Sequence, residues 1–195
     1  MHFEFYDTLS VVSHLEHQLK DVSVVEVQQF SYLSCLLWIY QGEGAAAWGY
    51  RYITNEYGAP FSTEIKTQFE NLVGMGYLAM TTTGYYRTTA VGGAALSTLR
   101  QLSQYAKREV CIRTAVQCIR FIPYGEVKLA VQQEPTLRSA RTVHQRALLL
   151  DDEGAAFTLL YEQFEMLRRV TGSEYDSLLV PAMAWLGATR QHPIG

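Results

Sequence analysis

The sequence predicts a mostly helical protein with a small β-hairpin wing: a winged helix-turn-helix with further helices at both ends. Three observations predict it. A capped amphipathic helix spans about residues 62–73, and Gly74 and Gly76 stop it. Two runs rich in β-forming residues follow, 77–82 and 85–89, separated by a tight turn. A helix followed directly by a hairpin is the second half of a winged helix.

The helix after residue 62 has clear start signals. Ser62 follows the turn-forming segment Gly58-Ala59-Pro60 and is a good N-cap, and Glu64 falls in the first turn, where the helix dipole favours an acid. Four apolar residues then recur at i, i+4, i+7 and i+8 and form one stripe: Ile65, Phe69, Leu72 and Val73. This pattern is typical of an amphipathic helix.

Two further helical patterns lie upstream and predict the first half of the module. Residues 25–40 carry enough apolar side chains for a buried helix at the centre of the core. Residues 45–57 are expected to form a second helix before the break at Gly58. An amphipathic N-terminal helix is expected over 5–20. The alternative to the winged helix is a generic α+β domain with one hairpin.

Downstream of the hairpin the pattern is helical, without a repeat or a flexible linker. Helices are expected over 92–105, 107–121, 126–133, 136–150, 154–171 and 174–187, followed by a frayed tail. The chain is therefore divided into an N-terminal helix (1–24), a winged-helix domain (25–92) and a C-terminal helical region (93–195).

Composition indicates a globular protein of the cytoplasm. Of the 195 residues 48% are apolar, enough for a sizeable core, yet no apolar run reaches the roughly 18 residues of a membrane span. The N-terminus lacks the basic and apolar regions of a signal peptide. Cys35, Cys111 and Cys118 lie inside apolar helical patterns and are predicted to be buried free thiols.

The formal net charge of −3 is unevenly spread along the chain. Residues 107–146 hold eight basic and three acidic side chains, a net charge of +5, whereas the segments before and after them each carry −4. Such a basic segment is typical of a local contact with an acidic surface or with nucleic acid. The alternative is a solvated helix face that acids on neighbouring elements balance.

The sequence shows no pattern of a catalytic site. It has no GxxxxGK[ST] phosphate loop and no CxxC pair. His14 and His17 lie three residues apart, but without a third ligand nearby they are expected to face solvent rather than to bind zinc. Acids at 151–153 are expected to be partners of a helix dipole rather than a cation site. We therefore predict a protein that is not an enzyme and that needs no cofactor or metal.

The predicted winged helix supplies candidate contacts to a partner protein or to double-stranded DNA. They lie on the exposed face of its third helix and on the wing: Thr63, Lys66, Thr67, Asn71, Tyr85, Tyr86 and Arg87. Glu64 and Glu70 oppose the approach of phosphate, and this helix has a single lysine. Protein docking is therefore the better-supported use of this surface, and DNA contact is the alternative.

Part of the chain also matches a known pattern. The matching residues are Trp48-Gly49-Tyr50-Arg51-Tyr52, Tyr57-Gly58-Ala59-Pro60-Phe61-Ser62, Leu72-Val73-Gly74-Met75-Gly76-Tyr77-Leu78, Tyr86 and Thr89. Together they resemble the "YGPFS … L … GYL … Y.LT..G" pattern of the middle components of bacterial ABC-three-component systems, which include Lamassu-type anti-phage defence. A related pattern occurs in SocA-like Panacea antitoxins. The similarity covers roughly residues 25–100.

The resemblance implies a non-catalytic subunit that docks on and regulates an SMC-like ABC ATPase, bridging it to an effector and to DNA held by the complex. The +5 segment would then face DNA or an acidic partner, with Arg138, Arg141 and Arg146 as candidate contacts. The competing hypothesis is a free-standing winged-helix transcription regulator or antitoxin. Such a protein would be a homodimer with its two recognition helices about one DNA turn apart.

Overall fold

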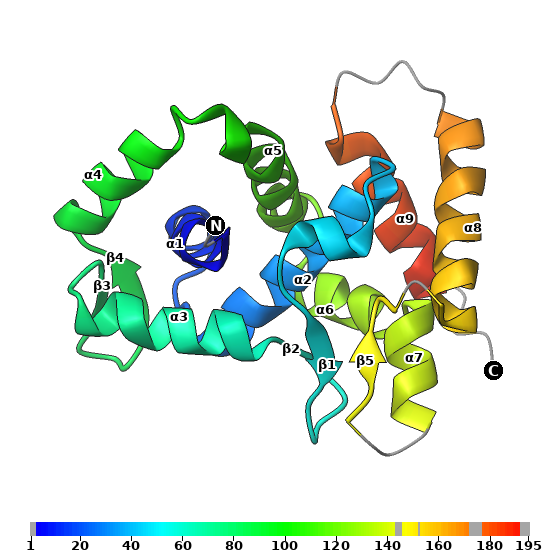
Figure 1. The fold of residues 1–195 in the computed structure, drawn as a ribbon, viewed down its shortest axis with the longest axis horizontal. Helices are drawn as coiled ribbons and strands as arrows, with labels where there is room; N and C mark the ends of the chain where they lie inside the picture. The colour runs from blue at the N-terminus through cyan, green and yellow to red at the C-terminus, as the bar shows by residue number, and fades with distance from the viewer. Residues whose placement is uncertain (1–2, 143–145, 152, 172–176, 192–195) are drawn as a thin grey trace.

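The computed structural model describes residues 3–142, 146–151, 153–171 and 177–191 (Figure 1). The protein is mostly helical, with a small amount of antiparallel sheet. Its α-helices are α1 (Phe3–Leu15), α2 (Val24–Tyr40), α3 (Thr63–Gly74), α4 (Ala90–Leu99), α5 (Ser103–Gln117), α6 (Tyr124–Gln132), α7 (Pro135–Thr142), α8 (Ala155–Thr171) and α9 (Leu179–Gln191). The strands are β1 (Tyr52–Thr54), β2 (Pro60–Phe61), β3 (Leu78–Met80), β4 (Tyr86–Thr88) and β5 (Leu148–Leu149), and the 3-10 helices are η1 (Ala45–Trp48) and η2 (Cys118–Arg120).

Helix α1 lies in the middle of the N-terminal half. Figure 1 shows it end-on, with α3, α4 and α5 around it, and α2 packs against it as well. The sequence predicts a single apolar side for this helix, yet Asp7, Thr8 and Ser10 are buried together with Leu9 and Val12. The helix is therefore enclosed rather than amphipathic. Its buried polar side chains need partners inside the protein.

Helix α2 is the buried helix that the sequence predicts over 25–40. It begins with a capping box, in which the Ser23 N–H donates to Glu26 Oε2 at 2.9 Å. It packs against α1 and α5 at one side of the molecule and against α8 at the other (Figure 1). The core of the protein is thus continuous through α2.

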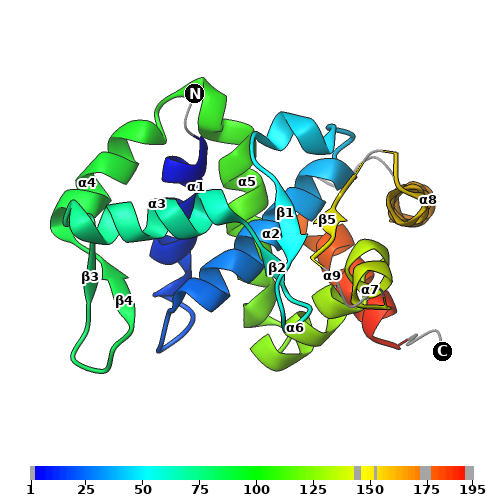
Figure 2. The same ribbon diagram turned by 60° about the horizontal axis from the view of Figure 1, so that its bottom comes forward.

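The predicted helix followed by a hairpin is confirmed, as α3, β3 and β4. The two strands pair antiparallel, with Leu78 opposite Thr88 and Met80 opposite Tyr86. Gly76, with a φ of +75°, turns the chain between α3 and β3, which is a conformation that favours glycine. Figure 2 shows the hairpin projecting beyond α3 at one end of the molecule.

The prediction of a second helix over 45–57 is wrong. Only η1 forms there, and the chain then continues into β1. Trp48, Tyr50, Tyr52 and Thr54 are buried, whereas the residues between them are more exposed. This alternation has the period of a strand, not of a helix. Because a strand and not a helix precedes α3, the winged helix-turn-helix itself is not confirmed.

The prediction of a helix over 136–150 is also wrong for its second half. Helix α7 ends at Thr142, and Leu148–Leu149 form β5, while 143–145 lie outside the described residues. β5 pairs with β1, which gives a three-stranded sheet in the order β2-β1-β5. The free edge of β1 offers hydrogen bonds to this segment, such as that from the Thr54 N–H to the Ala147 carbonyl at 3.0 Å. The local sequence pattern does not show that this edge is available.

The remaining helices follow the sequence more closely. The helix expected over 92–105 is interrupted, because α4 ends at Leu99 and α5 begins at Ser103. α6 and α8 confirm the helices expected over 126–133 and 154–171, whereas α9 begins at Leu179, later than predicted. Residues 174–176 and most of the predicted tail lie outside the described residues. In the described ranges, no helix has both the length and the apolar character needed to cross a membrane.

A buried polar network joins the elements of the N-terminal half. The Tyr50 hydroxyl donates to Asp7 Oδ2 at 2.7 Å, and Arg108 of α5 pairs with the same carboxylate. The Ser31 hydroxyl on α2 lies 2.8 Å from the Tyr50 hydroxyl and 2.7 Å from that of Tyr52. The tyrosines that precede and begin β1 thus supply hydrogen-bond partners for Asp7 of α1 and Ser31 of α2.

Candidate interaction site

Helix α3 is fixed at its start by a side chain of α2. Gln28 donates through Nε2 to the Ser62 carbonyl and accepts from the Ser62 N–H, both at 2.8 Å. The Ser62 hydroxyl in turn accepts from the Ile65 N–H at 3.4 Å, as its predicted role of N-cap requires. The buried amide of Gln28 therefore sets where α3 begins and how it is oriented.

The two faces of α3 differ as the sequence predicts. Ile65, Phe69 and Leu72 are buried, and α1 packs against this helix. The opposite face is exposed and carries four of the predicted contact residues: Thr63, Lys66, Thr67 and Asn71. Lys66 Nζ lies 2.6 Å from Glu70 Oε1, so the one cation of this face is already paired.

The hairpin is held against the body of the protein by its β4 side. The Tyr86 ring packs edge-on against Phe69 with centroids 4.8 Å apart, and the Tyr86 N–H donates to the Val22 carbonyl at 2.9 Å. The Thr88 N–H donates to Glu16 Oε2 at 2.8 Å. Tyr85 and Tyr86 are half-buried, while Arg87 is exposed. Of the predicted wing contacts, Arg87 is therefore the most accessible.

Two methionines that the sequence analysis missed stand out on this unit. Met75 at the end of α3 is 56% exposed, and Met80 on β3 is 64% exposed. Val91, in the first turn of α4, is 60% exposed. The sequence indicates the exposure of Met75, because this residue lies between two helix-stopping glycines, where no helix face can bury it. We name Met75, Met80, Arg87 and the exposed face of α3 the α3–hairpin surface, in which Met80 and Arg87 lie on opposite faces of the hairpin because Met80 pairs with Tyr86, the neighbour of Arg87.

The structure separates the three candidate arginines. Arg141 and Arg146 line one surface cavity of about 440 Å³ together with the β1–β2 turn, which includes the exposed Tyr57. At this turn, the Arg141 side chain runs so close to Gly58 that a Cβ there would lie 2.8 Å from Arg141 Cγ. Arg138 lines a different groove, between α7, α8 and α9.

The +5 segment is not one basic surface. Arg108 is buried, with its guanidinium 3.7 Å from the centre of the Trp48 ring, and it pairs with Asp7. Lys107 pairs with Glu43. Two of the segment's eight cations are thus paired with acids of the same chain. Arg141 and Arg146 form an exposed basic pair.

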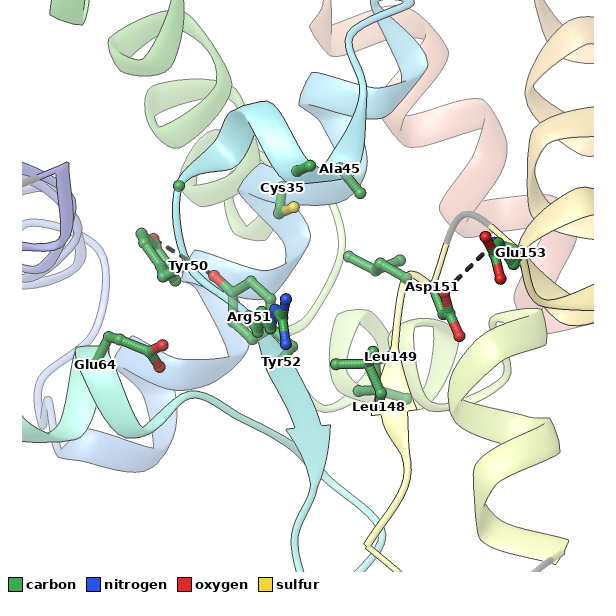
Figure 3. Close-up of a pocket in the computed structure, with 13 residues that line it drawn as sticks. Cys35, Ala45, Tyr50, Arg51, Tyr52, Glu64, Leu148, Leu149, Asp151 and Glu153 are labelled. Carbon is green, nitrogen blue, oxygen red and sulfur yellow. Dashed lines mark hydrogen bonds between the residues drawn. The ribbon is translucent and has the colours of Figure 1, made fainter.

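A surface cavity of about 700 Å³ lies between the η1–β1 segment and the chain after β5 (Figure 3). Among its described lining residues Arg51 is the one cation, and three are acids: Glu64, Asp151 and Glu153. Leu150, where the chain leaves β5, has a φ of +56°, an uncommon conformation for leucine. Arg51, Glu64 and the acids at 151–153 stand out separately in the sequence, but nothing there brings them together, because the cleft depends on the unexpected pairing of β1 with β5.

The three cysteines and His14 have structural roles, whereas His17 is exposed. All three cysteines are buried and free, as predicted, and burial raises the pKa of Cys111 and Cys118 to about 12, which makes them poor nucleophiles. His14 is half-buried, not solvent-facing as expected, because its Nε2 lies 2.8 Å from Glu109 Oε1. Across the described ranges, no three or more His, Cys, Asp or Glu side chains are grouped to hold a metal ion.

Comparison of the chain with models of known protein families, with curated proteins and with solved structures gave no match.

Proposed function

We propose that this protein is a non-catalytic docking subunit that binds and regulates an SMC-like ABC ATPase in a bacterial anti-phage defence complex. In this proposal α3 and the β3–β4 hairpin act as a winged-helix unit whose α3–hairpin surface contacts the ATPase. The subunit would bridge the ATPase to an effector in the cytoplasm. Its resemblance to the middle components of ABC-three-component systems, over roughly residues 25–100, supports the choice of partner.

The observation that carries docking to a protein is the exposure of Met75, at the end of α3, and of Met80, on β3. The exposed face of α3 carries Glu64, Lys66 and Glu70, a net charge of −1. Each methionine leaves more than half of its surface in water, at 56% and 64%. Methionine is flexible and polarizable, so it adapts to the shape of an apolar partner. Tyr86 and Thr88 of β4, the strand that pairs with the strand of Met80, are held by Phe69, Val22 and Glu16, which gives Met80 a rigid support.

Charge on the same surface disfavours DNA as the main ligand. Proteins that bind DNA obtain much of their affinity from cations that neutralise phosphates. The α3 face offers Lys66, which is already paired with Glu70, and the hairpin adds Arg87. The exposed pair Arg141 and Arg146 is the better candidate for an acidic partner or for DNA held by the complex, and it lies in a separate cavity.

A free-standing winged-helix regulator is the second candidate function. It is favoured by the exposed polar side chains of α3, since Thr63, Thr67 and Asn71 can all hydrogen-bond to bases or phosphates. In that case the purified protein would shift its own promoter fragment at low salt, and the shift would weaken steeply as salt rises.

A pull-down of the ATPase encoded in the native gene neighbourhood tests the proposal with two matched variants. Met80→Glu places a charge on the α3–hairpin surface and should abolish capture of the ATPase. Met166→Glu makes the same change on the exposed face of α8 and should leave capture unchanged. Both variants should keep the circular dichroism spectrum of the parent protein. Equal capture by Met80→Glu and the parent protein would contradict docking through this surface.

A further inference from the structure

Helix α8 has an apolar stripe that the described part of the chain leaves exposed. Leu160 and Phe164 are buried and face the core. On the adjacent side, residues 159, 163, 166 and 170 fall at spacings of four, three and four, which places them in one line along the helix. They are Leu159, Gln163, Met166 and Val170, and the three apolar ones are 43%, 58% and 85% exposed. Figure 2, which looks along α8, places it at the outer edge of the molecule.

This stripe forms one wall of a groove of about 390 Å³. Trp185 and Ala188 of α9 line the groove, and Pro135 and Arg138 of α7 complete it. From residue 159 to residue 170 the stripe is about 16 Å long at 1.5 Å per residue. These dimensions suit a helix lying alongside α8, in the manner of a helix bound in a groove.

The spacing of the stripe is self-complementary. If a second α8 lies antiparallel to the first, a two-fold axis between positions 164 and 165 places Leu159 opposite Val170 of the copy and Gln163 opposite Met166 of the copy. The two copies of Gln163 are then about 4.5 Å apart along the direction of the helices, within reach of an amide–amide hydrogen bond. A single polar residue in an apolar helix seam is a known means of fixing register and orientation.

Charges beside the stripe are arranged with nearly the same symmetry. Glu162 and Arg169, seven residues apart, flank it on the solvent side, and both are exposed. Neither forms an ion pair with another residue in the described part of the chain. In the antiparallel arrangement Arg169 of the copy lies two residues, about 3 Å along the helix, from the position opposite Glu162, so these long side chains can form two pairs of opposite charge across the two-fold axis. A partner of uniform charge would leave one of these residues facing a like charge.

We propose that the stripe on α8 is a homodimer interface, occupied by α8 of a second copy of this chain in antiparallel orientation. The contact is isologous, since the same residues serve both protomers. It is independent of the proposed docking to an ATPase, because it lies on α8 and leaves the α3–hairpin surface free.

Mass measurement in solution, by light scattering coupled to gel filtration at low salt, tests the interface. The parent protein should elute as a dimer, and Met166→Glu, which brings two like charges to the axis, should elute as a monomer. Met75→Glu is the matched control and should remain a dimer. Glu162→Arg should weaken the dimer because each arginine then faces Arg169 of the copy. The double variant Glu162→Arg with Arg169→Glu should restore it.

Mixed cross-linking tests the orientation. When single variants Gln163→Cys and Met166→Cys are mixed and mildly oxidised, the mixed dimer should form faster than either variant cross-links with itself. A parent protein that stays monomeric would overturn the proposal, and so would a dimer that Met166→Glu leaves intact. A Glu162→Arg variant that the second substitution fails to restore would overturn the antiparallel pairing. Loss of the dimer with full capture of the ATPase would separate this inference from the proposed function.

Discussion

Asp7 and Arg108 form a buried ion pair between residues 101 positions apart, and it joins α1 to α5. Arg108 Nε donates to Asp7 Oδ1 at 2.9 Å, and Nη2 donates to Oδ2, so the contact is bidentate. The guanidinium also lies between the rings of Phe3 and Trp48, with centroids 4.4 and 3.7 Å away. Since both charges are removed from water, each depends on the other for solvation.

Removing the carboxylate should therefore destabilise the protein strongly. In Asp7→Ala the arginine would stay buried without a counter-charge, and the free energy of unfolding should fall by about 3–5 kcal/mol. Urea denaturation followed by circular dichroism measures this loss. Lys66→Ala is the control, because its exposed i,i+4 pair with Glu70 should contribute only about 0.5 kcal/mol or less. Similar losses for the two variants would show that the buried pair is not a central support.

Two neighbouring glycines of α4 should respond oppositely to alanine. A Cβ on Gly92 would lie 2.3 Å from the Tyr77 carbonyl oxygen, so Gly92→Ala should lower the free energy of unfolding by about 1–3 kcal/mol. A Cβ on Gly93 would meet no atom within 4 Å, and Gly93→Ala should raise it by about 0.5–1 kcal/mol through helix propensity. Thermal melts of the two variants give the comparison. Stabilisation by both would contradict the close packing of α4 on the α3–β3 turn.

Glu109 should make stability depend on pH in acid. Burial alone would raise the pKa of this carboxyl, but hydrogen bonds from His14, Ser10 and Tyr6 outweigh it and lower the pKa to about 2 from its usual 4.5. The folded-state pKa is depressed, so the stabilisation is complete above about pH 5 and is lost as the pH falls towards 2. At roughly 1.4 kcal/mol per pKa unit it is on the order of 3 kcal/mol.

The measurement is the difference in unfolding free energy between the parent protein and Glu109→Gln at a series of pH values. Taking the difference removes the contributions of other carboxyls, such as Glu134, whose pKa burial raises. The difference should shrink between pH 5 and pH 2. A constant difference over this range would contradict the role of the cluster around Glu109.

Reversing the exposed basic pair should affect partners and not folding. Arg141→Glu with Arg146→Glu changes two exposed side chains of the 440 Å³ cavity, so the free energy of unfolding should stay within about 0.5 kcal/mol of the parent value. Assembly with the partner complex, or retention of DNA by it, should be reduced. Arg113→Glu, an exposed residue of α5 outside this cavity, is the matched control. Unchanged assembly and DNA retention would remove the pair from the proposed contacts.

The sequence predicts well the parts of the fold that local signals determine. The Ser62 cap, the Ile65–Phe69–Leu72 stripe and the glycine stop gave α3 and the hairpin nearly as observed, because each is decided within a few residues. The failures lie where long-range pairing decides. β5 is a strand because β1 has a free edge for it, although Leu148 and Leu149 fit a helical pattern equally well.

The same distinction applies to the candidate site. Exposed positions on α3 follow from helical periodicity, so Thr63, Lys66, Thr67 and Asn71 were found. Counting charges along the sequence placed Arg108 in a basic segment, because no neighbouring residue indicates that Arg108 pairs with the distant Asp7 in the core. The alternation of aromatic residues from Trp48 to Tyr52 was present in the sequence and indicates a strand, since a period of two does not fit a helix.

The most direct test of the proposed function is purification of the tagged protein, expressed with its native gene neighbourhood, followed by mass spectrometry and measurement of the mass of the intact complex. Docking as a non-catalytic subunit predicts a stoichiometric large ATPase in the purified complex, lost on Met80→Glu. Recovery of the protein without an ATPase, in a form that shifts its own promoter DNA, would contradict the account and favour the free-standing regulator.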